Sequence, residues 1–281
     1  MNSANMQNAS TQFTTEAIAF VRYLYFDFWK EKGDKRVEEY PFMNGGPWSM
    51  LTTIIFYIYL VKSLGPELMK NRKPFNLRSL MVFYNFLMVA FSAWMFAKGC
   101  SLTNFGLNLW CCQEVDYTST TGAAVELIEM GWVFFVTKFI EFIDTFFFVL
   151  RKKQNQVTHL HVIHHSLVPI SVWIGLKFAP GGNNAMFPLL NSFVHTIMYF
   201  YYGLSAIGPQ MQPYLRWKRY LTSIQMLQFV IVIIYGLRAL VMYDCEFPKS
   251  FLLLNLSNAI LFLILFQSFY MRSYIKKQHI Q

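Results

Sequence analysis

Charge is scarce in this sequence: only 14% of its 281 residues are Asp, Glu, Lys or Arg, whereas soluble proteins carry about 25%. An apolar core of the signal-peptide type is also missing from the polar residues 1–16, so we expect no cleavable leader and insertion directed by the first membrane helix. Hydrophobic residues, by contrast, make up 55% of the chain. These proportions favour a membrane protein over one or two soluble domains.

Long apolar segments are abundant. A membrane-spanning helix needs about 20 mostly apolar residues. Segments of this kind lie at 48–64, 79–97, 125–150, 158–176, 186–204, 219–243 and 251–271. We therefore predict an all-α, polytopic membrane protein with seven transmembrane helices over residues 48–271. An N-terminal tail, 1–47, precedes them and contains an amphipathic segment at 17–31; a basic tail, 272–281, follows.

Basic residues are shared unequally between successive loops. The alternate loops hold three Lys or Arg residues, whereas the first, third and fifth loops and the C-terminal tail hold thirteen, among them Arg72, Arg151, Lys152 and Lys218. Positively charged loops stay in the cytosol, so we expect a cytosolic C-terminus and a lumenal or external N-terminus. The glycosylation sequon at Asn8 has meaning only with that orientation. Such clusters favour anionic lipid or an anionic substrate over nucleic acid.

Cysteines number only four. Cys100, Cys111 and Cys112 lie in the second loop and Cys245 in the sixth, all on the predicted oxidising side, where disulfides persist. We expect a bridge from Cys112 or Cys111 to Cys245, with free buried thiols as the other outcome. The same placement excludes a cysteine nucleophile near the basic loops.

Histidines gather in one short part of the chain. His161, His164 and His165 form an HxxHH box whose spacing puts all three on one helix face. Ionisable residues within a membrane helix point to a functional site, because burying them is costly. Other polar residues recur at helical spacing in neighbouring segments: Lys138, Glu141 and Asp144; Asn191, His195 and Tyr199; Thr222, Gln225 and Gln228. We interpret these stripes as one polar chamber open to the cytosol, although the last set could equally be interhelical hydrogen bonding.

Three kinds of function could use such a chamber. Imidazole binds iron, so the box could belong to an iron-dependent lipid hydroxylase or desaturase, with Glu141 and Asp144 completing the ligands. Those enzymes need several boxes, and this chain has one. A non-enzymatic lipid or proton carrier would need polar residues through to the lumenal end. A neutral imidazole can instead attack a thioester, with a second imidazole moving the proton and the basic loops binding coenzyme A phosphates.

Five motifs carry a family resemblance that covers about residues 37–277. They are NRKPF at 71–75, KFIEFIDT at 138–145, QVTHLHVIHH at 156–165, NSFVHTIMYFYY at 191–202 and TSIQMLQF at 222–229. In these motifs and their order, the chain resembles the very-long-chain fatty acid elongases, membrane condensing enzymes of the endoplasmic reticulum whose products include sphingolipid precursors.

The resemblance implies an architecture and a reaction. Helices 2–7 would enclose an acyl-chain tunnel closed at the lumenal end. A long-chain acyl-CoA would condense with malonyl-CoA, release carbon dioxide and coenzyme A, and give a 3-oxoacyl-CoA two carbons longer, with no metal or redox cofactor. The resemblance further implies homodimers and contacts with the ketoacyl-CoA reductase, hydroxyacyl-CoA dehydratase and enoyl-CoA reductase of the same cycle.

Residue roles follow from the same resemblance. His164 matches the second histidine of the family box and is the expected nucleophile, with His195 as its partner in proton transfer or malonyl-CoA activation. His161 and His165 would orient and polarise the reacting groups, and Asp144 would fix a histidine tautomer. A further set would contact substrate or line the chamber: Lys138, Glu141, Asn191, Tyr199 and Gln225. Four basic residues would bind coenzyme A: Arg72, Arg151, Lys152 and Lys218.

Overall fold

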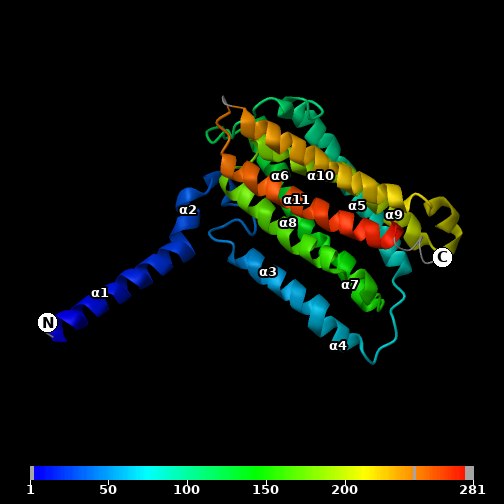
Figure 1. Cartoon of the computed structure of the whole chain (residues 1–281), viewed down its shortest axis with the longest axis horizontal. Helices are drawn as coiled ribbons and strands as arrows, with labels where there is room; N and C mark the ends of the chain where they lie inside the picture. Colours follow the sequence, from blue (N-terminus) through cyan, green and yellow to red (C-terminus); the bar gives the residue numbers. More distant parts are fainter. Residues whose placement is uncertain (1–2, 243–244, 276–281) are drawn as a thin grey trace.

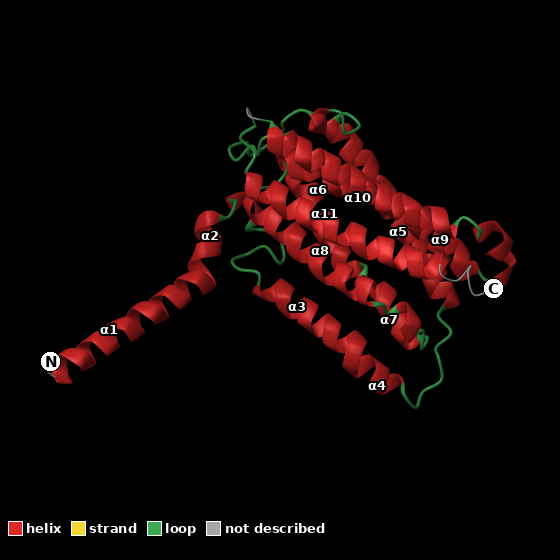
Figure 2. Cartoon of the chain, viewed as in Figure 1, coloured by secondary structure: helices red, strands yellow, loops and turns green. Residues whose placement is uncertain are grey.

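Helices form every regular element of the described chain. The computed structural model describes residues 3–242 and 245–275, and within these ranges there is no β-strand (Figure 2). The all-α class predicted from the sequence is therefore confirmed for this part of the chain.

An N-terminal helical arm extends away from the rest of the molecule (Figure 1). It consists of α1 (Ser3–Arg22), the π-helical turn Tyr23–Asp27 and α2 (Phe28–Lys32). The predicted amphipathic segment 17–31 lies in this arm, and Asn8 lies in α1. Apolar side chains such as Phe20 are exposed along the arm.

The remaining helices lie side by side in a bundle (Figure 1). In chain order they are α3 (Trp48–Tyr59), α4 (Gly65–Met69), α5 (Arg78–Thr103), α6 (Ala123–Ile140), α7 (Phe142–Leu150), α8 (His159–Phe178), α9 (Met186–Ile207), α10 (Lys218–Val241) and α11 (Lys249–Tyr270). The longest packing runs are between α5 and α9 and between α10 and α11. Helix α8 contacts α3, α6 and α11, so the histidine box on α8 lies inside the bundle.

Four described helices are long and apolar enough to cross a membrane: Trp48–Met69, Arg78–Thr103, Lys218–Val241 and Lys249–Ile275. They coincide with the first, second, sixth and seventh predicted spans. The other three predicted spans are helical as well, as α6 with α7, α8 and α9. They do not meet the same criterion of length, hydropathy and number of charges within the described residues. The number of seven spans therefore stays a prediction.

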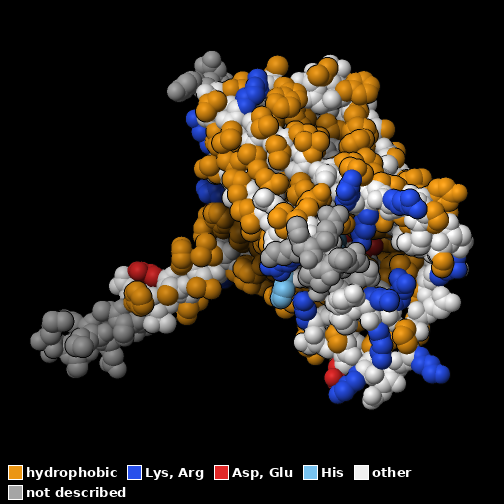
Figure 3. Space-filling model, turned by 45° about the vertical axis from the view of Figure 1, so that its right-hand side comes forward, with side chains coloured by type: hydrophobic (Ala, Val, Ile, Leu, Met, Phe, Trp, Pro, Cys, Tyr) orange, Lys and Arg blue, Asp and Glu red, His pale blue; other side chains and the backbone are white. Residues whose placement is uncertain are grey.

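The surface matches a membrane environment. Orange apolar side chains cover much of the face in Figure 3, and blue Lys and Arg side chains gather toward one end. Large apolar residues on the long helices, including Phe83, Ile234 and Ile264, are more than half exposed. Such contiguous exposure would be unfavourable in water and is suited to lipid. The chain is thus a multi-pass membrane protein.

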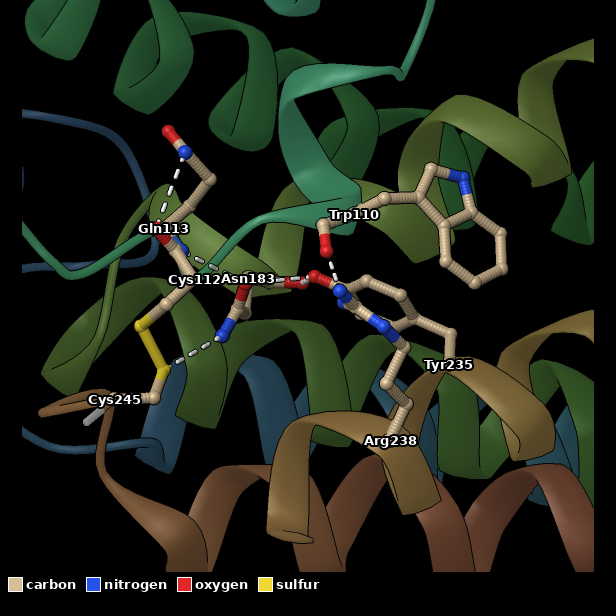
Figure 4. Close-up of a disulfide and its surroundings, with 7 residues drawn as sticks. All are labelled: Trp110, Cys112, Gln113, Asn183, Tyr235, Arg238 and Cys245. Carbon is tan, nitrogen blue, oxygen red and sulfur yellow. Dashed lines mark hydrogen bonds between the residues drawn. A yellow bond between two sulfur atoms is a disulfide. The ribbon is translucent and has the colours of Figure 1, made fainter. Parts of the chain in front are cut away.

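A disulfide joins Cys112 to Cys245 across 133 positions of sequence (Figure 4). It ties the α5–α6 loop to the α10–α11 loop, as predicted, and resolves the choice between Cys111 and Cys112 in favour of Cys112. Cys111 is an exposed free thiol and Cys100 a buried one. We call this end of the bundle the disulfide end, and the opposite end, where α8 begins, the histidine end.

Candidate functional site

The break between α6 and α7 places a carboxylate inside the bundle. Helix α6 ends at Ile140 and α7 begins at Phe142, so Glu141 occupies the junction, where its side chain is 1% exposed. Glu141 Oε1 accepts a hydrogen bond from Lys138 Nζ at 2.6 Å, and His195 Nδ1 lies 3.1 Å from the same oxygen. One carboxylate oxygen thus joins a lysine of α6 to a histidine of α9.

Lys138 is buried but well partnered. Its Nζ also donates to Asn191 Oδ1 at 3.1 Å and lies 4.3 Å from the centre of the Phe134 ring. Asn191 and His195 are one turn apart on α9, so both reach the Lys138–Glu141 pair from the same helix face. A buried charge persists only with such partners. The sequence prediction that Lys138, Glu141, Asn191 and His195 belong to one chamber agrees with this arrangement.

Asp144 occupies the next turn of α7 and has a different partner. Its Oδ2 accepts a hydrogen bond from the Tyr199 hydroxyl at 2.8 Å. The carboxylate next to His195 is Glu141 and not Asp144, and the expectation that Asp144 orients a histidine stays a prediction. The shift has a geometric reason: Asp144 lies three residues after Glu141, and Tyr199 four residues after His195, so the second pair forms one turn farther along both helices.

A short chain of hydroxyl groups ends on His161. The Tyr57 hydroxyl lies 2.9 Å from Thr145 Oγ1, which in turn lies 2.8 Å from His161 Nε2. Tyr57 comes from α3, is 1% exposed, and stacks on the Phe142 ring with 4.0 Å between ring centres. Sequence reasoning missed Tyr57, whose only signal was a hydroxyl within an apolar segment.

The three box histidines share the first two turns of α8. Thr158 caps the helix by accepting from His161 N at 3.2 Å. The His165 ring centre lies 4.3 Å from that of His161 and 5.2 Å from that of His164. His165 is buried, whereas His164 is partly exposed and packs against Phe262 of α11 with 5.2 Å between ring centres.

A cavity extends from this point toward the disulfide end. Phe262, which contacts His164, lines it, as does Val168, one turn beyond His164 on α8. Its walls come from α5, α6, α8, α9, α10 and α11 and are mainly apolar. His164 is therefore the box histidine that adjoins the start of an apolar cavity.

The remaining predicted substrate residues lie toward the histidine end. Gln225 Nε2 donates to Met198 Sδ at 3.4 Å, and Arg151 Nη1 to Met81 Sδ at 3.2 Å. Lys152 is exposed and donates to the Lys70 carbonyl at 3.0 Å. Arg72 and Lys218 are also exposed. None of these side chains joins the Glu141 cluster through a hydrogen bond among the described residues.

The described residues contain no group of three or more His, Cys, Asp or Glu side chains arranged to hold a metal ion. The Nε2 atom of His161 is already hydrogen-bonded to Thr145, and the Glu141 carboxylate already contacts Lys138 as well as His195. The geometry therefore gives no support to the iron-dependent alternative.

Comparison with known proteins gives a consistent result. The sequence model of the GNS1/SUR4 family matches residues 42–281. The chain is 44% identical over 261 residues to "Very long chain fatty acid elongase 7" of Drosophila melanogaster, a match that covers 90% of this chain and 78% of the relative. It is 48% identical over 243 residues to a very long chain fatty acid elongase of Aedes aegypti, covering 86% and 67%. It is 44% identical over 245 residues to "Very long chain fatty acid elongase 1" of Homo sapiens, covering 86% and 87%.

Proposed function

The chain belongs to the GNS1/SUR4 family of condensing enzymes that elongate fatty acids, and on this basis we propose that His164 carries the acyl group while a long-chain acyl-CoA condenses with malonyl-CoA. The observation that carries this proposal is the position of His164, which packs on Phe262 where the apolar cavity begins. An acyl chain lying in that cavity would bring its thioester to the His164 ring.

The reaction balances as two displacements. A neutral His164 nitrogen attacks the thioester carbon, the carbon–sulfur bond breaks, and the departing coenzyme A sulfur takes up the proton. Malonyl-CoA then loses carbon dioxide, and the resulting carbanion attacks the acyl-imidazole. The carbon–nitrogen bond of the acyl-imidazole breaks, and the departing imidazole nitrogen takes up one proton from solvent. The products are a 3-oxoacyl-CoA two carbons longer and a free imidazole. Decarboxylation supplies the carbanion, so the proposal needs no metal or redox cofactor.

His195 is the partner for malonyl-CoA or for proton transfer. Its Nδ1 faces Glu141 Oε1, which fixes the ring and its tautomer and leaves the second ring nitrogen for the substrate. Glu141, held by Lys138, thus takes the orienting role that the sequence analysis gave to Asp144. His161 and His165 would polarise the reacting carbonyl from the same helix face.

The proposed topology has seven spans, with α3 to α4 first and then α5, α6 with α7, α8, α9, α10 and α11. The histidine end faces the cytosol, so Arg72, Arg151, Lys152 and Lys218 can bind coenzyme A phosphates there. The N-terminus with Asn8 and the disulfide end face the lumen of the endoplasmic reticulum, and the C-terminus is cytosolic. Helices 2–7 then enclose an acyl-chain tunnel that is closed at the lumenal end.

Within this proposal the protein works as a homodimer and hands its product to the ketoacyl-CoA reductase, hydroxyacyl-CoA dehydratase and enoyl-CoA reductase of the cycle. A 3-oxoacyl-CoA requires these three reactions to become a saturated acyl-CoA. Crosslinking in intact membranes would test both contacts.

The decisive experiment combines two measurements on the purified, chelator-treated protein. Release of labelled carbon dioxide from malonyl-CoA should require a long-chain acyl-CoA and survive metal removal. Intact-mass analysis with acyl-CoA alone should find an acyl adduct that disappears in His164→Ala and persists in the matched variant His165→Ala. Equal adduct levels in both variants, or release that metal removal abolishes, would overturn the proposal.

A further inference from the structure

The far end of the cavity is lined by the turn between α8 and α9. Five residues of this turn line the cavity, and we call them the end wall: Ala179, Pro180, Gly181, Asn184 and Ala185. Asn184 is held from two sides, since its Nδ2 donates to the Ala179 carbonyl and its Oδ1 accepts from Asn255 Nδ2 of α11, each at 2.8 Å.

Asn183, in the middle of the same turn, does not line the cavity and is fixed from outside (Figure 4). Its backbone N donates to the Gln113 carbonyl at 2.9 Å, and its Oδ1 accepts from Gln113 N at 3.2 Å. The Tyr235 hydroxyl donates to the same Oδ1 at 2.7 Å. Asn183 Nδ2 donates to the Cys245 sulfur at 3.6 Å. One buried amide thus connects the end wall to a loop, a helix and the disulfide.

The turn packs closely against the backbone behind it. Gly182 adopts a positive φ of 51°, and a Cβ atom there would lie 2.7 Å from the Gln113 carbonyl oxygen and 2.8 Å from that of Glu114. The turn therefore rests directly on residues 113–114. That segment is anchored in turn by the adjacent disulfide from Cys112 to Cys245.

We propose that Asn183, Tyr235 and the Cys112–Cys245 disulfide together act as a clamp that sets the longest acyl chain the enzyme accepts, by holding the end wall in place. The inference rests on the proposed function, in which the acyl chain occupies the cavity. These are positioning residues: they touch neither the cavity nor the reacting atoms, and they act through Asn184 and its neighbours in the end wall.

The proposal predicts a change in selectivity more than a change in rate. Loosening the clamp lets the end wall yield, so a chain two carbons longer can bury its additional methylene groups. Each buried methylene favours binding roughly fourfold, so the preference for the longer primer should rise by up to roughly 15-fold. Primers within the normal range should be condensed at nearly the original rate, because the histidine end is unchanged.

The experiment measures condensation rates of the full-length protein with saturated acyl-CoA primers of stepwise increasing length. Asn183→Ala removes the amide, Tyr235→Phe removes one hydroxyl, and Cys245→Ser removes the disulfide. Asn108→Ala is the matched control, because Asn108 is exposed in the same region and its side chain makes no hydrogen bond in the described structure. We expect the three clamp variants, but not the control, to accept primers at least two carbons longer than the wild type does.

A cavity variant separates failure of this inference from failure of the proposed function. Ala259 of α11 lines the cavity, and Ala259→Phe should shorten the longest accepted primer if the acyl chain lies there. No shortening would refute the cavity as the acyl site. Shortening in Ala259→Phe, with an unchanged limit or a uniform rate loss in folded Tyr235→Phe and Cys245→Ser, would refute the clamp. Tyr235→Phe keeps the test decisive if Asn183→Ala fails to fold.

Discussion

The two ends of the bundle differ in how completely their buried polar side chains are hydrogen-bonded. At the histidine end, Glu141 Oε1 accepts a hydrogen bond from Lys138 Nζ and lies next to His195 Nδ1, but Glu141 Oε2 has no hydrogen-bond partner among the described residues. At the disulfide end, both side-chain polar atoms of Asn183 are hydrogen-bonded, and a covalent bond reinforces the same region. A buried acceptor without a partner is costly and is characteristic of a site that meets a ligand, whereas full satisfaction is characteristic of a structural element.

This difference suits the two ends of the bundle to different roles. Chemistry requires side chains whose remaining hydrogen-bonding capacity can turn to a substrate, and in the proposed mechanism Glu141 at the α6–α7 junction provides it. A cavity that limits chain length requires a wall that does not move, and the proposed clamp would provide it. Variants at the two ends should therefore produce separable effects, on rate at the histidine end and on stability or chain length at the disulfide end.

The largest effect is expected from Glu141→Gln. The substitution keeps the size of the side chain but removes the charge that pairs with Lys138 and fixes His195. We expect kcat for condensation to fall by about 10² to 10⁴, the range that positioned acid–base groups contribute. Steady-state kinetics with purified protein would measure it.

Asp144→Asn is the matched control for this prediction. The Tyr199 hydroxyl can still donate to the amide oxygen of the new side chain, so its loss in kcat should be clearly smaller. An equal loss in both variants would contradict the assignment of Glu141 as the carboxylate that orients His195.

Removal of the disulfide should affect stability first. Cys245→Ser frees a loop closed across 133 positions, and loss of a native disulfide typically costs about 2–5 kcal/mol. We expect a lower Tm in detergent with kcat on mid-length primers nearly unchanged. Cys111→Ser, which alters an exposed free thiol, is the control and should leave Tm as it is. A large loss of kcat at temperatures where Cys245→Ser stays folded would contradict the proposal that the disulfide end affects stability and chain length but not the rate.

A smaller effect is expected from Tyr57→Phe at the histidine end. The hydroxyl reaches His161 only through Thr145, and Thr145 keeps its contact with His161 Nε2 after the change. We therefore expect a fall in kcat of about tenfold or less, equivalent to one hydrogen bond of about 1 kcal/mol. Tyr59→Phe, on the half-exposed outer side of α3, is the control. A drop as large as that of Glu141→Gln would place Tyr57 in the catalytic machinery.

Much of the site could be predicted from the sequence, because helical spacing alone brings together His161, His164 and His165, and also Asn191 with His195. The pairing of carboxylates with their partners could not be predicted. This pairing depends on the interruption of the helix at Glu141, where the sequence has no glycine or proline. It also depends on which turns of α7 and α9 lie next to each other in the bundle.

The disulfide illustrates a similar limit. Loop topology selected Cys245 and the pair Cys111–Cys112, but adjacent residues point in different directions and only the folded backbone decides between them. The third, fourth and fifth predicted spans likewise fall outside the criterion for membrane-spanning helices within the described residues, although α8 and α9 are regular helices. Sequence patterns therefore identified the participants, whereas their partners depended on tertiary packing.

The smallest effect is expected at Asp116, in the α5–α6 loop beside the clamp. Hydrogen bonds from Ser119 and then from Thr118 hold the pKa of this exposed carboxyl well below its usual range. A depressed carboxyl pKa stabilises the fold above the unfolded-state pKa of about 3.9, and this contribution is lost as the pH falls below that value. Asp116→Ala should therefore lower Tm slightly at pH 7, and its difference from the wild type should shrink near pH 3. A difference that stays constant from pH 7 to pH 3 would show that the carboxylate charge contributes nothing, and that the loop is held by Arg36, which donates to the carbonyl oxygens of Asp116 and Ser119.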